Sequence, residues 1–279
     1  MIKLTSGCRQ CHVQRAQEAY IWGMHPITHY FDKQFQLRYF EMNELGAASP
    51  ATMLTLLEEA AAEHCYSIDH SLYQLADQNI GWVLISGVLE MERYPRYKEK
   101  ITIRTWLSDY SRIKGHRENL IFDEQGNIIG RARGLWIFFD INRRRPIQIL
   151  DEIMERWSFC EVKALDQNIS EKIESIEAAD YEQKFKINKY DTDMIKHVNN
   201  IRYLQWAIES IPDAIIDQYY LHSIDGRFLS EAYYGQTLLS RTKAVQSNSA
   251  ADHSFIHSIC IEGSDKICAT AKTVWKKKN

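Results

Sequence analysis

The hydrophobic pattern of the chain changes between helical and strand-like spacing, and it does so twice in the same order. Apolar residues recur at helical spacing in residues 51–65 and again in residues 200–211. Ser49 precedes the first segment, and Asn199 and Asn200 open the second; such residues cap helix N-termini. The pattern therefore predicts one long helix in each half of the chain.

Strand-like segments surround both predicted helices. Their apolar and polar residues alternate, with Gly, Asn, Asp and Ser in the turns, as in antiparallel sheets. The segments are residues 33–39, 82–90, 100–106, 117–122 and 128–140 in the first half, and 223–232, 236–246, 253–262 and 267–275 in the second. The sequence thus predicts an α+β protein.

The two halves are also related to each other in sequence. A shift of 150 residues without a gap places Phe35 on Phe185 and Leu54 on Leu204. Such self-similarity indicates an internal duplication and two domains of like fold. We divide the chain into an N-terminal extension, a first domain, a connector and a second domain, which are residues 1–30, 31–150, 151–180 and 181–279. Within the connector we expect helices at 151–157 and 170–177.

The composition fits this division and excludes several classes of protein. With 279 residues, of which 45% are hydrophobic, the chain can bury two cores of ordinary size. A net charge of −3 gives no indication of nucleic-acid binding. No apolar run approaches the roughly 18 residues that span a bilayer, and no basic-then-apolar leader is visible. The six cysteines do not resemble a disulfide framework, so we expect a cytoplasmic protein.

Two metal-binding patterns overlap near the N-terminus. Cys8, Cys11 and His12 match the attachment motif of c-type haem. Together with His25 and His29, the two cysteines also have zinc-finger spacing. Haem attachment normally requires export, and the segment lacks the apolar core residues of a small finger. We therefore expect a polar extension without a metal, with zinc binding as the alternative.

Residues 189–212 concentrate the polar side chains with catalytic potential. Asp193 and His197 lie just before the second predicted helix, where backbone N–H groups without partners favour developing negative charge. An acid and an imidazole at such a point could split an acyl bond. The alternative is an ordinary capped helix whose acids complement its dipole.

The same residues carry a family resemblance. The pattern D-M-x-x-H-V-N-N-x-x-Y-x-x-W-x-x-E-S-x-P, in residues 193–212, resembles the central motif of the acyl-acyl carrier protein thioesterases of plants and bacteria. Similar segments extend over residues 33–279. The resemblance implies a tandem (double) hot-dog fold, with two antiparallel sheets that each wrap around a long central helix. One position differs, because Ile195 stands where the family usually has Asn.

The resemblance also implies site residues. It adds Glu231, within F-L-S-E-A-Y-Y-G-Q, as a catalytic acid on a strand of the second domain. Asp193 and Glu231 are then the candidate bases, and His197 would orient the water or donate to the thioester oxygen. The oxyanion would be bound, and the substrate positioned, by backbone N–H groups at the helix start, those of Val198, Asn199 and Asn200.

The first copy lacks this acid–imidazole pair, because Asn43 and Ala47 stand at the positions of Asp193 and His197. One active site is therefore expected, with the first domain supplying the acyl pocket. Candidate pocket residues on its helix, for which core packing is the alternative, are Met53, Leu54 and Leu57. A basic run could bind an acidic carrier protein or form a solvated turn; it comprises Arg143, Arg144 and Arg145.

The expected function is hydrolysis of acyl-acyl carrier protein, which releases free fatty acid in fatty acid biosynthesis. A thioester is already activated, so the reaction requires neither a metal nor another cofactor. The partner would be the acyl carrier protein, and the protein itself would be a monomeric pseudo-dimer or a homodimer. The alternatives are a hot-dog acyl-CoA thioesterase and an acyl-binding protein without hydrolysis, the latter suggested by Ile195.

Overall fold

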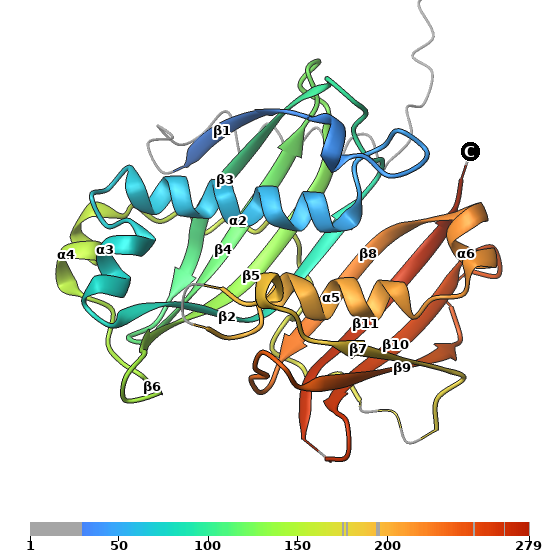
Figure 1. Cartoon of the computed structure of the whole chain (residues 1–279). Coiled ribbons are helices and arrows are strands. Elements are labelled where there is room, and N and C mark those ends of the chain that lie inside the picture. The colour runs from blue at the N-terminus through green and yellow to red at the C-terminus, as the bar shows by residue number, and fades with distance from the viewer. Residues whose placement is uncertain are drawn as a thin grey trace, which may run out of the picture.

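The computed structural model describes residues 30–174, 176, 178–193, 196–247, 249–264 and 266–278. Each half of the chain forms an antiparallel sheet that curves around one long helix (Figure 1). This is the α+β arrangement that the sequence pattern predicts, with the tandem hot-dog fold that the family resemblance implies. In the described part of the chain, no helix combines the length and the apolar character needed to cross a bilayer.

In the first half the long helix is α2, Pro50–Tyr66. It begins where the sequence predicts, because the Ser49 hydroxyl accepts a hydrogen bond from the Thr52 N–H at 3.1 Å and Pro50 takes the first helical position. The other elements of this half are β1 (Phe31–Gln36), the 3₁₀ turn η1 (Tyr39–Glu41), α3 (Leu72–Asp77), β2 (Ile80–Met91), β3 (Lys100–Tyr110), β4 (Lys114–Phe122), β5 (Ile128–Asp140), β6 (Arg145–Pro146) and α4 (Asp151–Arg156).

The second half repeats this plan around α5, Asn200–Glu209. Its cap is Asn199, whose side-chain oxygen accepts from the Ile201 N–H at 2.8 Å. The other elements are β7 (Tyr181–Lys186), η2 (Lys189–Asp191), α6 (Asp213–Gln218), β8 (Tyr219–Phe228), β9 (Thr237–Val245), β10 (His253–Ile261) and β11 (Ile267–Lys277).

The two halves are joined edge to edge. Strand β2 pairs antiparallel with β8, from Ser86 opposite Arg227 to Glu90 opposite Ser223. In the described residues eleven strands therefore form one sheet, ten of them in the order β1-β3-β4-β5-β2-β8-β11-β10-β9-β7, with β6 paired to β5. The order is symmetric about the β2–β8 junction, which we call the seam. The two predicted sheets are thus continuous across the seam, and the chain is a pseudo-dimer.

Two differences from the sequence prediction bear on the site. Residues 170–174 and 176 form no helix. They run instead along the second half, where the Arg227 guanidinium bonds the Glu171 carbonyl at 2.7 Å. The strand predicted at 223–232 ends at Phe228, because the next two N–H groups both donate to one carbonyl, that of Cys268, at 2.8 and 3.2 Å. The loop that follows therefore no longer takes part in the backbone hydrogen bonding between β8 and β11.

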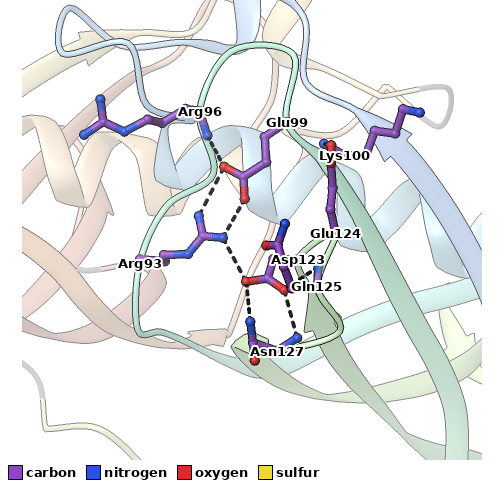
Figure 2. A network of polar contacts seen from close by, with 8 residues as sticks. All are labelled: Arg93, Arg96, Glu99, Lys100, Asp123, Glu124, Gln125 and Asn127. Carbon is purple, nitrogen blue, oxygen red and sulfur yellow. Dashed lines mark hydrogen bonds and ion pairs between the residues drawn. The ribbon is translucent and has the colours of Figure 1, made fainter.

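The loop after β2 is held by a polar network (Figure 2). Arg93 donates to Glu99 at 3.2 Å and to Asp123 at 3.1 Å, so it ties this loop to the β4–β5 turn. The same loop supplies the Pro95 carbonyl, which accepts from the Ala48 N–H at 2.8 Å. The network thereby fixes the backbone that leads into α2.

The two long helices differ in what they pack against. Tyr203 and Trp206 of α5 are buried in the core of the second half. Met53 of α2 belongs to a core that continues across the seam to Leu204 and Leu221. Another face of α2 is not filled by side chains and borders a cavity. In the first half, the space beside the central helix therefore stays open.

Candidate active site

The turn before α5 places an acid and an imidazole together. The Asp193 N–H donates to the His197 carbonyl at 2.8 Å, and the Lys196 N–H donates to the Asp193 carbonyl at 3.0 Å. The Asp193 carboxylate accepts from the His197 N–H at 3.2 Å. Lys196 has a φ of 64°, in the left-handed region that such a tight turn requires. Asp193 therefore builds the turn that presents the His197 ring.

The start of α5 offers one free N–H group, fewer than the sequence predicts. The Val198 N–H donates to the Ala232 carbonyl at 3.1 Å, and the Asn199 N–H donates to the Asp191 carbonyl at 3.0 Å. The prediction that these two groups bind an oxyanion is therefore wrong. The Asn200 N–H has no acceptor among the described residues, and it stands at the first position of the helix. Of the three backbone N–H groups predicted to bind the oxyanion, that of Asn200 remains.

Glu231 joins this turn from the loop after β8 and not from a strand. Its Oε1 lies 3.2 Å from Nδ1 of His197. Its Oε2 accepts from the Tyr233 hydroxyl at 3.1 Å. The Tyr233 ring also meets the imidazole edge-on, with ring centroids 5.4 Å apart. The structure thus brings Asp193, His197 and Glu231 together, and it adds Tyr233, which the sequence analysis missed.

Arg144 is also part of this cluster. The sequence predicts it as a carrier-binding residue, but its guanidinium forms an ion pair with Glu231 and its Nη1 lies 3.2 Å from Nε2 of His197. It reaches them from the β5–β6 turn of the first half, with a φ of 53°. The neighbouring Arg143 stays at the surface beside Asp140, and Arg145 is exposed at the start of β6. Of the three arginines, Arg144 alone touches the candidate site.

His197 is held as a neutral imidazole. Burial lowers its pKa below the usual value, and the Arg144 charge lowers it further, while the charge of Asp193 acts in the opposite direction. Because arginine can only donate, Nε2 must accept from Arg144, and the ring proton is therefore on Nδ1 and directed to Glu231. The carboxylate thereby fixes the tautomer and the orientation of the ring.

The cluster opens into a cavity of about 770 Å³. The cavity is bordered by Asp193, His197 and Asn200 at the α5 end, by Tyr203 and the loop after β8 beside them, and by the strands and helices of the first half elsewhere. On α2, the bordering residues are Glu58, Ala61, Ala62 and Cys65. The prediction that the first half supplies the pocket therefore agrees with the location of the cavity.

The predicted pocket residues on α2 divide into two groups. Leu54 and Leu57 border a smaller adjoining space of about 70 Å³, which also reaches Asn200. Met53 is completely buried in the core and borders neither space, so its prediction as a pocket residue is wrong. The helix turns Met53 toward the sheet, because Met53 and Leu54 are neighbours and point to different faces.

Glu58 is the second residue that sequence analysis missed. Burial raises its pKa to about 7, the charge of Asp193 raises it as well, and the Asn199 side chain acts in the opposite direction. Its carboxyl therefore lies close to Asn199 and Asp193 at the start of α5, and Glu58 borders the cavity from α2. A signal was present in the sequence: Glu58 shares one helical face with Leu54 and Ala61, where an apolar residue is expected.

The described residues contain no group of three or more His, Cys, Asp or Glu side chains placed to hold a metal ion. Two predictions concern residues outside the described part of the chain. One is the possible metal pattern formed by Cys8, Cys11, His25 and His29. The other is the effect of Ile195 at a usual Asn position.

Comparison with known families decides the relationship. A family model described as the acyl-ACP thioesterase N-terminal domain matches residues 28–157, and one described as the C-terminal domain matches residues 174–277. The chain belongs to the acyl-ACP thioesterase family. The first match covers the first half and α4, and the second covers the second half.

Individual relatives of this thioesterase family resemble the chain over most of its length. A chloroplastic oleoyl-acyl carrier protein thioesterase of Arabidopsis thaliana is 25% identical over 278 residues, covering 89% of this chain and 76% of the relative. The solved 12:0-ACP thioesterase of Umbellularia californica has a TM-score of 0.80 at 23% identity, covering 89% and 94% of the two chains. An acyl-ACP thioesterase of Bacteroides thetaiotaomicron has a TM-score of 0.77 at 20% identity, covering 88% and 98%. These likenesses confirm the tandem hot-dog fold.

Proposed function

We propose that this member of the thioesterase family hydrolyses acyl-acyl carrier protein and releases a free fatty acid. The observation that carries the proposal is the contact between His197 and Glu231 at the start of α5, at one end of a cavity of about 770 Å³. A polar cluster of this kind beside a cavity with many apolar lining residues fits a substrate with a reactive polar end and an alkyl chain.

The substrate would lie with its thioester carbonyl at the N-terminus of α5. There the free N–H of Asn200 and the helix dipole stabilise negative charge on the carbonyl oxygen. The Asn200 side chain donates to the Leu84 carbonyl at 2.9 Å and so anchors this end of α5 to β2. The acyl chain would extend into the first half, past Leu84 and Trp136.

The reaction begins with attack of water on the carbonyl carbon. In our proposal the water gives its proton to Nε2 of neutral His197, whose opposite nitrogen is held by Glu231. The oxyanion then collapses, the carbon–sulfur bond breaks, and the sulfur takes the proton from His197. The products are the free acid and the carrier thiol, and Glu231 remains a carboxylate throughout.

Arg144 occupies Nε2 of His197 before substrate binds. For a water molecule to reach this nitrogen, the Arg144 hydrogen bond has to be released, while the ion pair with Glu231 can remain. Half of the Arg144 side chain is exposed, and it belongs to a surface turn, so such a movement disturbs no core packing. Glu58 is a second candidate base, favoured by its pKa of about 7.

Acyl carrier protein as the partner is supported by membership of the family and by exposed arginines next to the site. Arg143 and Arg145 flank Arg144 at the surface, where they can attract an acidic carrier. Because the seam already joins two hot-dog units in one chain, we propose a monomer as the functional unit. Free thiols at Cys65, Cys160, Cys260 and Cys268 support a reducing, cytoplasmic location.

The test is thiol release from one acyl chain offered on two carriers. We expect hydrolysis of the acyl-carrier protein thioester, with a higher kcat/KM than for the matching acyl-CoA. A preference for the CoA ester would favour the acyl-CoA thioesterase alternative. Tight binding of the acyl-carrier protein without release of thiol would contradict hydrolysis and favour an acyl-binding protein.

A further inference from the structure

A buried arginine lies in the wall of the cavity, away from the candidate active site. Arg117 of β4 is only 5% exposed, and it borders both the large cavity and the small one beside it. Its Nη1 is 3.0 Å from Nδ1 of His64 and 3.0 Å from Oγ1 of Thr105. Its guanidinium carbon is 5.6 Å from the ring centre of Trp157. All three of these contacts are with neutral groups.

The neutrality of these neighbours is firm. Burial and the charge of Arg117 lower the pKa of His64 to about 3, so this imidazole carries no charge at neutral pH. Burial also raises the pKa of the adjacent Cys65 thiol. None of the described carboxylates pairs with Arg117: Glu118, the next residue, faces the other side of the sheet and pairs with Arg133 at 2.9 Å. An unpaired charge of this kind is costly to bury.

Part of the Arg117 guanidinium remains available. Hydrogen bonds within the described residues use only Nη1. Nε and Nη2, which together carry three N–H groups, make no hydrogen bond with those residues. Because Arg117 borders the cavity, these groups can serve an acceptor that occupies the space.

The same region contains further donors without acceptors. The indole N–H groups of Trp82 and Trp157 are buried and have no hydrogen-bond partner among the described residues. Both residues border the large cavity, and their rings are 5.6 Å apart. Unsatisfied buried donors are rare in folded proteins and require an explanation. Here they accompany an unpaired cation, so this end of the cavity is rich in donors and poor in acceptors.

We propose that the Arg117 end of the cavity is a binding subsite for an oxygen acceptor carried on the acyl chain, namely a hydroxyl, keto or carboxylate oxygen. The inference rests on the proposed function and specifies its substrate class as oxygenated acyl thioesters. A plain alkyl chain would leave Arg117 desolvated and unpaired, whereas an oxygen on the chain would satisfy it.

The sheet register gives the position of the subsite. Arg117 lies opposite Gly134 of β5, and Gly134 lies opposite Gly87 of β2. Asn200, at the proposed thioester position, is bonded to Leu84 of β2. Leu84 pairs with Trp136, which lies opposite Gly115 of β4, two residues before Arg117. Two strand spacings and two residues along β4 therefore separate the thioester side from Arg117, on the order of 12 Å. An extended chain covers this distance with about ten carbons.

The experiment compares carrier thioesters of alkyl acids with their terminal hydroxyl, keto and carboxyl analogues, in lengths bracketing about ten carbons. For the wild-type protein we expect kcat/KM to be at least about tenfold higher for an oxygenated chain than for the alkyl chain of the same length. Arg117→Met should abolish or reverse this ratio. Arg117→Gln, which keeps donors without charge, should retain hydroxyl and keto preference and lose carboxylate preference.

The ratio of two substrates within one variant does not depend on how much of that variant is folded, so a less stable Arg117 variant still gives an answer. Arg112→Met is the matched control, because Arg112 is exposed and bonds Gln148 outside the cavity; its ratio should equal that of the wild type. A wild-type preference for alkyl chains at every length, or an unchanged ratio in Arg117→Met, would overturn the proposal.

Failure of the proposed function is measured separately. If no thioester is hydrolysed, calorimetric titration of the intact alkyl and hydroxyacyl carrier thioesters into the protein tests the subsite alone. Tighter binding of the hydroxyacyl thioester, lost in Arg117→Met, supports the subsite even without hydrolysis. Equal binding of the two thioesters contradicts it.

Discussion

The two turns that precede α2 and α5 have the same backbone and different chemistry. In the first, the Asn43 N–H donates to the Ala47 carbonyl at 2.8 Å; in the second, the Asp193 N–H donates to the His197 carbonyl, also at 2.8 Å. In both turns the side-chain oxygen of the first residue accepts from the N–H of the last, at 3.1 and 3.2 Å. The scaffold of the site is therefore present twice, while the acid and the imidazole are present once.

The backbone position of Glu231, the third member of the cluster, is also present in both halves. The residue before each helix cap donates to the loop that follows the seam strand: Ala48 to Pro95 at 2.8 Å, and Val198 to Ala232 at 3.1 Å. The residues that immediately precede these two carbonyls therefore correspond to each other. One is Glu231 in the second half.

Its counterpart in the first half is Tyr94. The hydroxyl of Tyr94 donates to the Leu221 carbonyl at 2.9 Å, so the side chain crosses to the second half as a structural contact. Beside α5, Trp206 is buried in the core of the second half, whereas α2 borders the cavity. The comparison shows that the two copies differ in function. The second half carries the reactive groups, and the first half supplies α2 and most of the residues around the cavity.

The strongest test of this difference replaces a residue of the second half with its counterpart from the first half. His197→Ala, which copies Ala47, should lower kcat by about 10²–10⁴, because the proton acceptor at the start of α5 is removed. Thiol release measures the rate, and circular dichroism checks the fold. The reciprocal change, Ala47→His, should create no second site, since Asn43 and Tyr94 provide no acid. Unchanged turnover in His197→Ala would remove the imidazole from the mechanism.

Asp193→Asn likewise replaces the acid of the second half with its first-half counterpart, Asn43. Asn43 already supports this turn with its side-chain oxygen, so the substitution should preserve the backbone. We expect kcat to fall by about 10² if the carboxylate charge contributes to proton transfer. Asn43→Asp is the matched control and should leave the rate unchanged. A rate near that of wild type in Asp193→Asn would show that Asp193 only shapes the turn.

The cavity side of the comparison is tested on α2. Ala61→Phe should fill part of the space and reduce kcat/KM for long chains relative to short ones by about tenfold. Met53→Ala is the contrasting variant, because Met53 is buried in the core. It should lower the free energy of unfolding by about 2–5 kcal/mol in urea and leave the chain-length ratio unchanged. A shifted ratio in Met53→Ala would place Met53 in the acyl pocket after all.

The smallest expected effect concerns Glu58, whose counterpart in the second half is the apolar Ile208. With a pKa of about 7, folded protein keeps the Glu58 proton in a pH range where unfolded protein has lost it. Stability should therefore fall as pH rises from about 4 to about 7. Glu58→Gln removes this fall and should raise the free energy of unfolding at pH 8 by up to about 3 kcal/mol.

Urea titrations at several pH values measure this difference directly. Near pH 4 the wild-type protein and Glu58→Gln should have similar stability, because Glu58 is then protonated in both states. Glu59→Gln, a change at the exposed neighbour on α2, serves as the control. A wild-type protein that gains stability relative to Glu58→Gln above pH 7 would contradict the assignment.

The sequence predicted what depends on local spacing and failed where distant segments meet. The caps and starts of α2 and α5 follow from nearby residues and agree with the structure to within one residue, although α5 ends at Glu209, two residues before the predicted end. By contrast, the acceptor of the Val198 N–H is Ala232, far along the chain, so the loss of this oxyanion donor could not be read locally.

The same limit explains the missed members of the site. Arg144 approaches His197 from the other half, and only the folded seam brings the two together. Glu58 violates the apolar face of its helix, which was a visible signal, but its proximity to Asp193 depends on how α2 and α5 meet. The family motif supplied Glu231 correctly as a neighbour of His197, although not its position in a loop.

The seam also governs how the chain can be divided. Five residue pairs, from Ser86 with Arg227 to Glu90 with Ser223, satisfy the inner edges of both sheets. A fragment ending after α4 would expose the N–H and C=O groups along this edge of β2, a template for pairing with other chains. Such a fragment should therefore aggregate when it is expressed alone. Mixing the two separate halves should restore solubility only to the extent that pairing between β2 and β8 is faster than self-association of each half.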